Sequence, residues 1–149
     1  APMQLDEVLA AVCFSGVLER HPLLKMVLGE SGLGWVPYVL ERMDHQYTNY
    51  LSTVKDYRGE LLPSELFHRQ MYVTFEDDEL GIKLIPEIGA GNVMWASDYP
   101  HPDSTWPDSV PHVEAALRDL DEVSRRKVVW ENAAALYSCW PTVRSDTHG

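Results

Sequence analysis

Short apolar runs of strand length alternate with longer amphipathic stretches along this chain. β-Branched and aromatic content predicts strands at 23–28, 71–75 and 93–96. Apolar residues spaced three or four apart predict helices at 4–19, 36–54, 79–88, 110–120 and 124–138, and a short helix begins at Ser64. Helices separate each strand from the next, and no hairpin-length turn joins any two. This order predicts an α/β fold with a parallel sheet and right-handed crossovers.

Each predicted strand is followed by an acidic residue. Glu30 lies in a glycine-containing loop after the first strand, Glu76 follows the second, and Asp98 follows the third. Parallel strands end at the same edge of a sheet, so we expect these three carboxylates to share one face. The run Glu76-Asp77-Asp78, taken alone, is more typical of a helix amino-terminal cap and a solvated surface.

Asp98 stands at the end of the apolar run 93–96 and at the start of a proline-rich loop. Pro100 and Pro102 exclude helix there and favour an extended turn. Two interpretations of Asp98 are open. It is a catalytic or metal-binding residue on the tip of a buried strand, or it only caps a turn, as Asp often does.

Composition narrows the class of protein. The chain has 149 residues, of which 45% are hydrophobic, enough for one core. A formal net charge of −11 disfavours nucleic acids and acidic membrane surfaces as partners. No apolar run approaches the roughly 18 residues that cross a bilayer, and the first residues lack a signal-peptide pattern. Cys13 and Cys139 form no disulfide framework, which predicts a reducing, cytoplasmic location.

Three strands are too few to close a barrel, which commonly has eight. The chain is therefore predicted to be either a small open α/β layer or the carboxyl-terminal part of a (β/α)₈ barrel. Residues 1–140 would form this partial barrel and 141–149 a loose tail. Its two open strand edges predict pairing with another chain, for example as a homodimer.

Several motifs, in this order along the chain, resemble the amidohydrolase-related family, which includes aminocarboxymuconate-semialdehyde decarboxylase. The similarity runs from about Phe14 to Tyr137. The segments that carry it are Phe14–Pro22, Glu30–Pro37, Leu40–Asp44, Ser97–Pro102, Trp106-Pro107 and Glu131–Ala134.

The resemblance implies a metal-dependent barrel of which this chain supplies the last three strands. Asp98 matches the aspartate that binds the divalent metal, zinc or manganese, and accepts a proton. Arg42 matches an arginine that holds a substrate carboxylate, a role suited to its planar fork. Glu30 stands where the decarboxylases carry a histidine; it would act as a base or bind the metal weakly, but it cannot act as an imidazolium. The family's His-x-His pair does not occur in this sequence, so the metal site is expected to be incomplete in this chain.

Two further residues are candidates for substrate binding. His101 lies three residues beyond Asp98 and would either hydrogen-bond the substrate or pin the loop. Trp106, in the same loop region, is a candidate for lining the pocket, whereas Trp95 and Trp130 are predicted to lie in the core.

The sequence therefore predicts a portion of a metal-dependent hydrolase of the amidohydrolase type, acting on a C–N or C–O bond of a small molecule. A related decarboxylase or lyase reaction is included in this prediction. The alternative is a non-catalytic α/β module that binds a small ligand or a partner chain.

Overall fold

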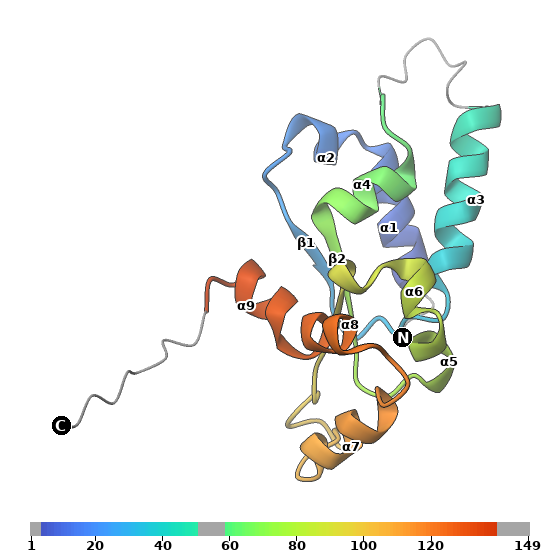
Figure 1. Ribbon diagram of the computed structural model, residues 1–149. Helices are drawn as coiled ribbons and strands as arrows, with labels where there is room; N and C mark the ends of the chain where they lie inside the picture. The colour runs from blue at the N-terminus through green and yellow to red at the C-terminus, as the bar shows by residue number, and fades with distance from the viewer. Residues whose placement is uncertain (1–3, 51–58, 140–149) are drawn as a thin grey trace.

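A parallel three-stranded sheet lies at the centre of the computed structural model, which describes residues 4–50 and 59–139 (Figure 1). The strands are β1 (Met26–Leu28), β2 (Met71–Phe75) and β3 (Val93–Trp95), in the order β1-β2-β3. Met26 pairs with Met71, and Val73 pairs with Val93. The predicted parallel pairing in sequence order is confirmed. Among the described residues, β1 and β3 have no strand on their outer edges, and pairing of these edges with another chain stays a prediction.

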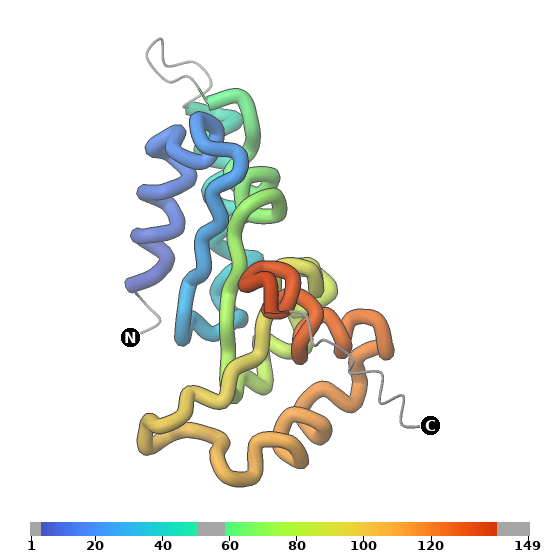
Figure 2. The backbone as a smooth tube through the Cα atoms, turned by 90° about the vertical axis from the view of Figure 1, so that its left-hand side faces the viewer, coloured from blue at the N-terminus to red at the C-terminus, as the bar shows by residue number. Residues whose placement is uncertain are grey.

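Helices connect and cover the strands. They are α1 (Leu5–Phe14), α2 (Val17–Arg20), α3 (Val36–Asn49), α4 (Pro63–Gln70), α5 (Glu79–Lys83), α6 (Ile85–Ile88), the 3₁₀ turn η3 (Ala90–Asn92), α7 (Ser109–Ala116), α8 (Glu122–Arg126), the π-helical turn η4 (Lys127–Glu131) and α9 (Asn132–Leu136). No helix within the described ranges is both long and apolar enough to span a bilayer. Figure 2 shows the loop between β3 and α7 extending beyond the end of the sheet where the strands finish.

Several predicted boundaries move for local reasons. The first helix breaks at Gly16, whose φ of 72° is left-handed. The first strand begins only at Met26, because residues 21–24 form a turn in which Leu24 N–H donates to the carbonyl of His21. Leu23 is consequently 92% exposed and not a strand residue. α3 ends at Asn49, with Tyr50 as its C-cap; residues 51–54 of that predicted helix and the predicted tail at 141–149 lie outside the described residues.

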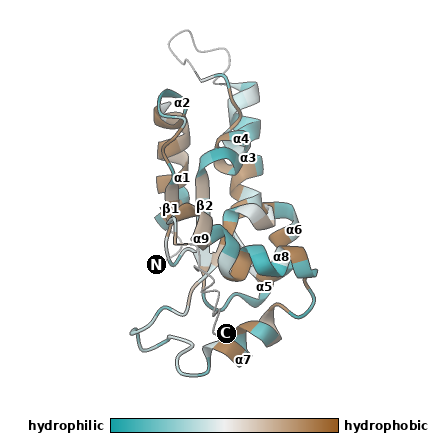
Figure 3. Ribbon diagram, turned by 60° about the vertical axis from the view of Figure 1, so that its left-hand side comes forward, coloured by the Kyte–Doolittle hydropathy of each residue, from teal (hydrophilic) through white to brown (hydrophobic). Residues whose placement is uncertain are grey.

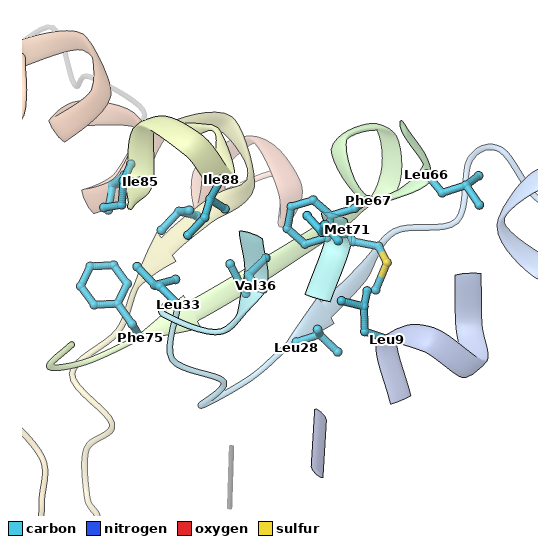
Figure 4. Packing of buried hydrophobic residues seen from close by; sticks show 14 of the residues in the cluster. Leu9, Leu28, Leu33, Val36, Leu66, Phe67, Met71, Phe75, Ile85 and Ile88 are labelled. Atoms are coloured by element: carbon cyan, nitrogen blue, oxygen red, sulfur yellow. The ribbon is translucent and has the colours of Figure 1, made fainter. Parts of the chain in front are cut away.

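The core joins the sheet to the helices on its faces. α1, α3 and α4 contact one another, and η4 packs on β3. Figure 4 shows Leu9, Leu28 and Met71 close together, with Phe75 and Ile85 in another part of the cluster. Apolar colour runs along α1 beside the strands (Figure 3). This burial fixes the strands, and the strands carry the loops of the site.

A buried asparagine fixes the approach to β3. Asn92 is 9% exposed, and its Nδ2 atom donates to the carbonyls of Phe67, His68 and Met71 at 3.3, 3.0 and 2.8 Å. Its Oδ1 atom lies 3.3 Å from His68 Nδ1. The side chain therefore links the start of β3 to the junction between α4 and β2.

Replacing Asn92 with alanine should leave the carbonyl of Met71 buried without this donor. Buried polar groups that lose a partner cost about 1–3 kcal/mol, so we expect that loss in the free energy of unfolding, measured by urea denaturation. Asn49→Ala is the matched control, because Asn49 is exposed and donates only to the carbonyl of His45 within its own helix. Equal stability of the two variants would show that the Asn92 link is dispensable.

Candidate functional site

A pocket of about 290 Å³ opens where the three parallel strands end. Loops that follow all three strands contribute ionisable side chains to its wall: Glu30, Glu76, Asp77, Asp98, His101 and Asp103. The prediction that Glu30, Glu76 and Asp98 share one end of the sheet is confirmed. Among the ionisable residues that line this pocket, five are carboxylates and one is an imidazole, so its field is strongly negative.

Asp98 is held in place by the loop that follows it. Its φ of 58° is a left-handed conformation, which is costly for a residue with a Cβ and persists where neighbouring structure enforces it. The carbonyl of Ser97 accepts hydrogen bonds from Thr105 N–H at 3.1 Å and Ser104 Oγ at 2.7 Å. His101 N–H closes the turn on the carbonyl of Asp98 at 2.9 Å. These bonds fix the carboxylate at the tip of β3.

Glu30 is held by the middle strand. It too has a left-handed backbone, with φ of 52°. Its N–H donates to Thr74 Oγ1 at 2.8 Å, and the next residue, Ser31, donates both its N–H and its hydroxyl to the carbonyl of Thr74. Thr74 therefore anchors the loop after β1 to β2 through its side chain and its backbone.

Two groups of donor atoms converge on Asp98. One donor atom each from Glu30, Asp98 and His101 lie within 4.8 Å of one another, and the same holds for Glu76, Asp98 and Asp103. His101 Nδ1 is 2.9 Å from Asp98 Oδ2. Carboxylate oxygens and imidazole nitrogen are ligands that zinc and manganese accept, so the residues present fit part of a divalent metal site.

Mutual repulsion and burial shift the protonation of the pocket. Burial, followed by the charges of Asp98 and Asp103, raises the pKa of Glu76. One carboxylate oxygen of Glu76, Oε2, is buried and has no hydrogen-bond partner among the residues that the structure describes. The hydrogen bond to Asp98 and the charge of Asp98, with a smaller contribution from Glu30, raise the pKa of His101. Protons therefore remain on these two groups at higher pH than is usual for their type.

Three of the five residues singled out from the sequence meet in this pocket, namely Asp98, Glu30 and His101. Arg42 is exposed on α3 and does not line it. Trp106 is 62% exposed and packs edge-to-face on Tyr99, with ring centroids 5.6 Å apart, also outside the lining. Their roles in substrate binding stay predictions.

Three carboxylates of the pocket lie outside these five residues: Glu76, Asp77 and Asp103. The sequence places Glu76 at the shared strand end, but the run Glu76-Asp77-Asp78 is more typical of a helix cap; Asp78 alone is the cap, and Glu76 and Asp77 line the pocket. Asp103 follows Asp98 by five residues in the same loop, a spacing whose only sequence signal is the turn-rich loop itself. Trp95, predicted to be core, is half-buried and donates Nε1–H to the carbonyl of Glu76 at 3.1 Å.

Comparison with known proteins adds a family and a fold. Residues 7–139 match the family model described as amidohydrolase. The chain is 29% identical over 129 residues to γ-resorcylate decarboxylase of Polaromonas sp. JS666, covering 83% of this chain and 37% of that enzyme. It is 29% identical over 131 residues to the enzyme of the same name from Rhodococcus jostii RHA1, covering 83% and 36%. The chain thus spans little more than a third of these curated relatives.

Solved structures give the same picture. The fold superposes on 5-carboxyvanillate decarboxylase of Sphingomonas paucimobilis with a TM-score of 0.71 and 28% identity, covering 87% of this chain and 38% of that one. It superposes on a dihydroxybenzoic acid decarboxylase of Polaromonas sp. JS666, solved with manganese and 2-nitroresorcinol, with a TM-score of 0.72 and 23% identity, covering 92% and 40%. The predicted partial (β/α)₈ barrel is confirmed by these matches and by the parallel sheet.

The raised pKa of His101 predicts a pH-dependent contribution to stability. In the metal-free chain, the protonated imidazole is stabilised by Asp98 only in the folded state, so this contribution is complete below the unfolded-state pKa. It is lost as pH rises through the higher, folded-state pKa. NMR titration of His101 in the presence of a chelator should show the raised value, and Asp98→Asn should lower it. An unchanged pKa in that variant would contradict the pairing.

The same geometry predicts weak metal binding by this chain alone. Structural and catalytic zinc sites use at least three protein ligands, and Glu30 and His101 are both exposed here. Calorimetric titration with zinc or manganese should give low affinity that Asp98→Ala abolishes. Tight, stoichiometric binding that depends on Asp98 would mean that the chain holds a complete ligand set.

Proposed function

The chain belongs to the amidohydrolase family, and we propose that it forms the carboxyl-terminal part of the active site of a metal-dependent lyase that decarboxylates a hydroxylated aromatic acid. The observation that carries the proposal is the convergence of Glu30, His101 and the strand-tip Asp98 in one pocket. The reaction class is supported by the names of the relatives, which are decarboxylases of γ-resorcylate and 5-carboxyvanillate.

A divalent metal, when bound, would supply positive charge that stabilises negative charge developing on the substrate. Asp98 would hold it, with oxygen and nitrogen donors from Glu30 and His101 nearby. Manganese is favoured over zinc by the manganese-containing decarboxylase structure, although the carboxylate-rich donor set accepts either ion. The remaining ligands would come from strands that this chain does not contain.

Residues of this chain would hold and transfer the proton that the reaction requires. Decarboxylation breaks the bond between the ring carbon and the carboxyl group, and the ring carbon takes a proton in its place. Asp98 is assigned as the group that exchanges this proton with the substrate. His101, bonded to Asp98 at 2.9 Å, orients its carboxylate. Glu76, whose pKa is raised by burial and by Asp98, is suited to hold a proton beside it.

Two predicted substrate contacts require structure beyond this pocket. Arg42 would bind a substrate carboxylate through its guanidinium fork, but it lies exposed on α3, away from the lining. Trp106 would offer an aromatic face to the substrate ring from beside Tyr99. Both assignments require a substrate that reaches past the loops of this chain.

Hydrolysis of a C–N or C–O bond is the second candidate, and Glu30 is the observation that favours it. A carboxylate at the position where the resemblance places an imidazole would serve as a general base toward water. Release of carbon dioxide from dihydroxybenzoates, measured beside hydrolysis of amide and ester substrates, separates the two reactions. A non-catalytic module would show neither reaction when joined to the rest of the barrel.

Asp98→Asn tests the assignment in the polypeptide that contains the whole barrel. The substitution preserves shape but removes the charge and the proton-accepting oxygen. General acid–base assistance contributes about 10²–10⁴-fold, so kcat should fall at least 100-fold with unchanged circular dichroism. Asp119→Asn, in which an exposed carboxylate is lost, is the control and should keep full activity. Activity of Asp98→Asn within a few-fold of wild type, with unchanged metal content, would make Asp98 a turn cap only.

A further inference from the structure

One carboxylate outside the ligand groups joins two of the loops that build the pocket. Asp78 Oδ2 accepts hydrogen bonds from the backbone N–H groups of Leu33 at 2.6 Å and Gly34 at 3.1 Å, both in the loop after β1. Its other oxygen, Oδ1, accepts from Gly81 N–H at 2.8 Å and so caps α5. Three backbone donors from two segments, more than 40 residues apart in sequence, therefore converge on a single side chain.

The surrounding backbone is shaped to admit this carboxylate. A Cβ atom on Gly81 would lie 2.3 Å from Asp78 Oδ2 and 2.5 Å from Leu33 Cβ, distances that real side chains do not adopt. A Cβ on Gly32, whose φ is 61°, would lie 3.3 Å from the same oxygen. The glycines thus allow α5 and the loop after β1 to approach Asp78 closely, and this contact depends on their lack of side chains.

The loop that Asp78 holds is the one that carries Glu30. Thr74 binds its beginning, through Glu30 N–H and Ser31, and Asp78 binds its end, through Leu33 and Gly34. Asp78 also lies two residues beyond Glu76. The short segment from Thr74 to Asp78 therefore fixes both ends of the loop after β1, and so fixes the position of Glu30 relative to Glu76 and Asp98.

We propose that Asp78 is a positioning residue for the candidate site: by binding the Leu33 and Gly34 amides it keeps Glu30 beside Asp98 and His101. The importance of this position of Glu30 for catalysis rests on the proposed function, but the hydrogen bonds between Asp78 and the loop do not. The simpler alternative is that Asp78 only caps α5, as Asp commonly does at a helix start. The two roles predict different results for a variant that still caps α5 but no longer binds the Leu33 and Gly34 amides. Only the positioning role predicts that the loop after β1 then becomes less ordered.

Asp78→Ser separates these roles. Serine is a good helix cap, but its side chain is too short to reach the loop after β1 as well. Asp78→Asn is the milder variant, should the serine variant fold poorly, because it keeps the length but removes one accepting oxygen and the charge. Glu79→Gln is the matched control: it removes a neighbouring carboxylate that is 92% exposed and forms an ion pair with Lys83.

The first measurement is amide hydrogen exchange by NMR on the metal-free chain. Hydrogen bonds to a charged acceptor are strong enough that losing them should speed exchange at Leu33 and Gly34 by about 10-fold or more. We expect Ser31, which Thr74 holds, to exchange faster too, relative to Ala96, whose N–H donates to Phe75 on the other side of β2. Amides of α5 should change little in Asp78→Ser. If the ratio of the Ser31 exchange rate to the Ala96 exchange rate is the same in Asp78→Ser as in Glu79→Gln, Asp78 is only a helix cap and the proposal is overturned.

The second measurement uses manganese as a paramagnetic probe on the same variants. In the wild-type chain, manganese should broaden the amide signals of Glu30, Asp98 and His101 together. In Asp78→Ser the broadening of Glu30 should weaken relative to that of His101, which a loss of stability alone would not produce. Equal broadening of both amides in that variant would also overturn the proposal. If the wild-type chain shows no broadening, the metal assignment fails, while the exchange measurement still decides the role of Asp78.

Discussion

Parallel pairing of three strands is the constraint on which the site depends. Because β1, β2 and β3 run the same way, their following loops meet at one edge, and each loop delivers an acidic side chain there. The core enforces this arrangement from the other side: the apolar residues of α1, α4 and η4 hold the sheet, and Asn92 fixes the start of β3 through three carbonyls. Loss of register in any strand would scatter the carboxylates.

The site combines strained backbone conformations with closely spaced like charges, which the rest of the fold must stabilise. Glu30 and Asp98 both have left-handed backbones, although neither is glycine. Glu30 is bonded to Thr74 of the neighbouring strand, and Asp98 to His101 of its own loop. Five carboxylates share one pocket, and burial with repulsion raises the pKa of Glu76. Strain and like charge brought together in one place are typical of binding and catalytic sites, where an incoming cation or substrate relieves them.

The sequence predicted much of this because parallel α/β topology follows from the order of apolar runs. Strand–helix alternation gave the strand order and brought Glu30, Glu76 and Asp98 to one face. It did not give the limits of β1, since Leu23 and Leu24 are apolar yet lie in a turn bonded to His21. It also missed Asp103, and it did not show which residues of the run Glu76-Asp77-Asp78 line the pocket and which one caps a helix. Which carboxylate caps a helix and which faces a pocket is decided by where backbone N–H groups from a distant loop arrive, as Leu33 and Gly34 do at Asp78.

The anchors of the loop after β1 have a consequence for how chemistry can be exchanged on this scaffold. Thr74 binds the backbone N–H of position 30, and Asp78 binds the backbone N–H groups of positions 33 and 34. Within the described residues, these hydrogen bonds hold the loop through its backbone and do not use the Glu30 side chain. The anchors of this loop therefore do not depend on which side chain stands at position 30. A carboxylate, an imidazole or a neutral amide at position 30 would project from the same point, so the chemistry of this side chain can change while the anchors of its loop stay the same.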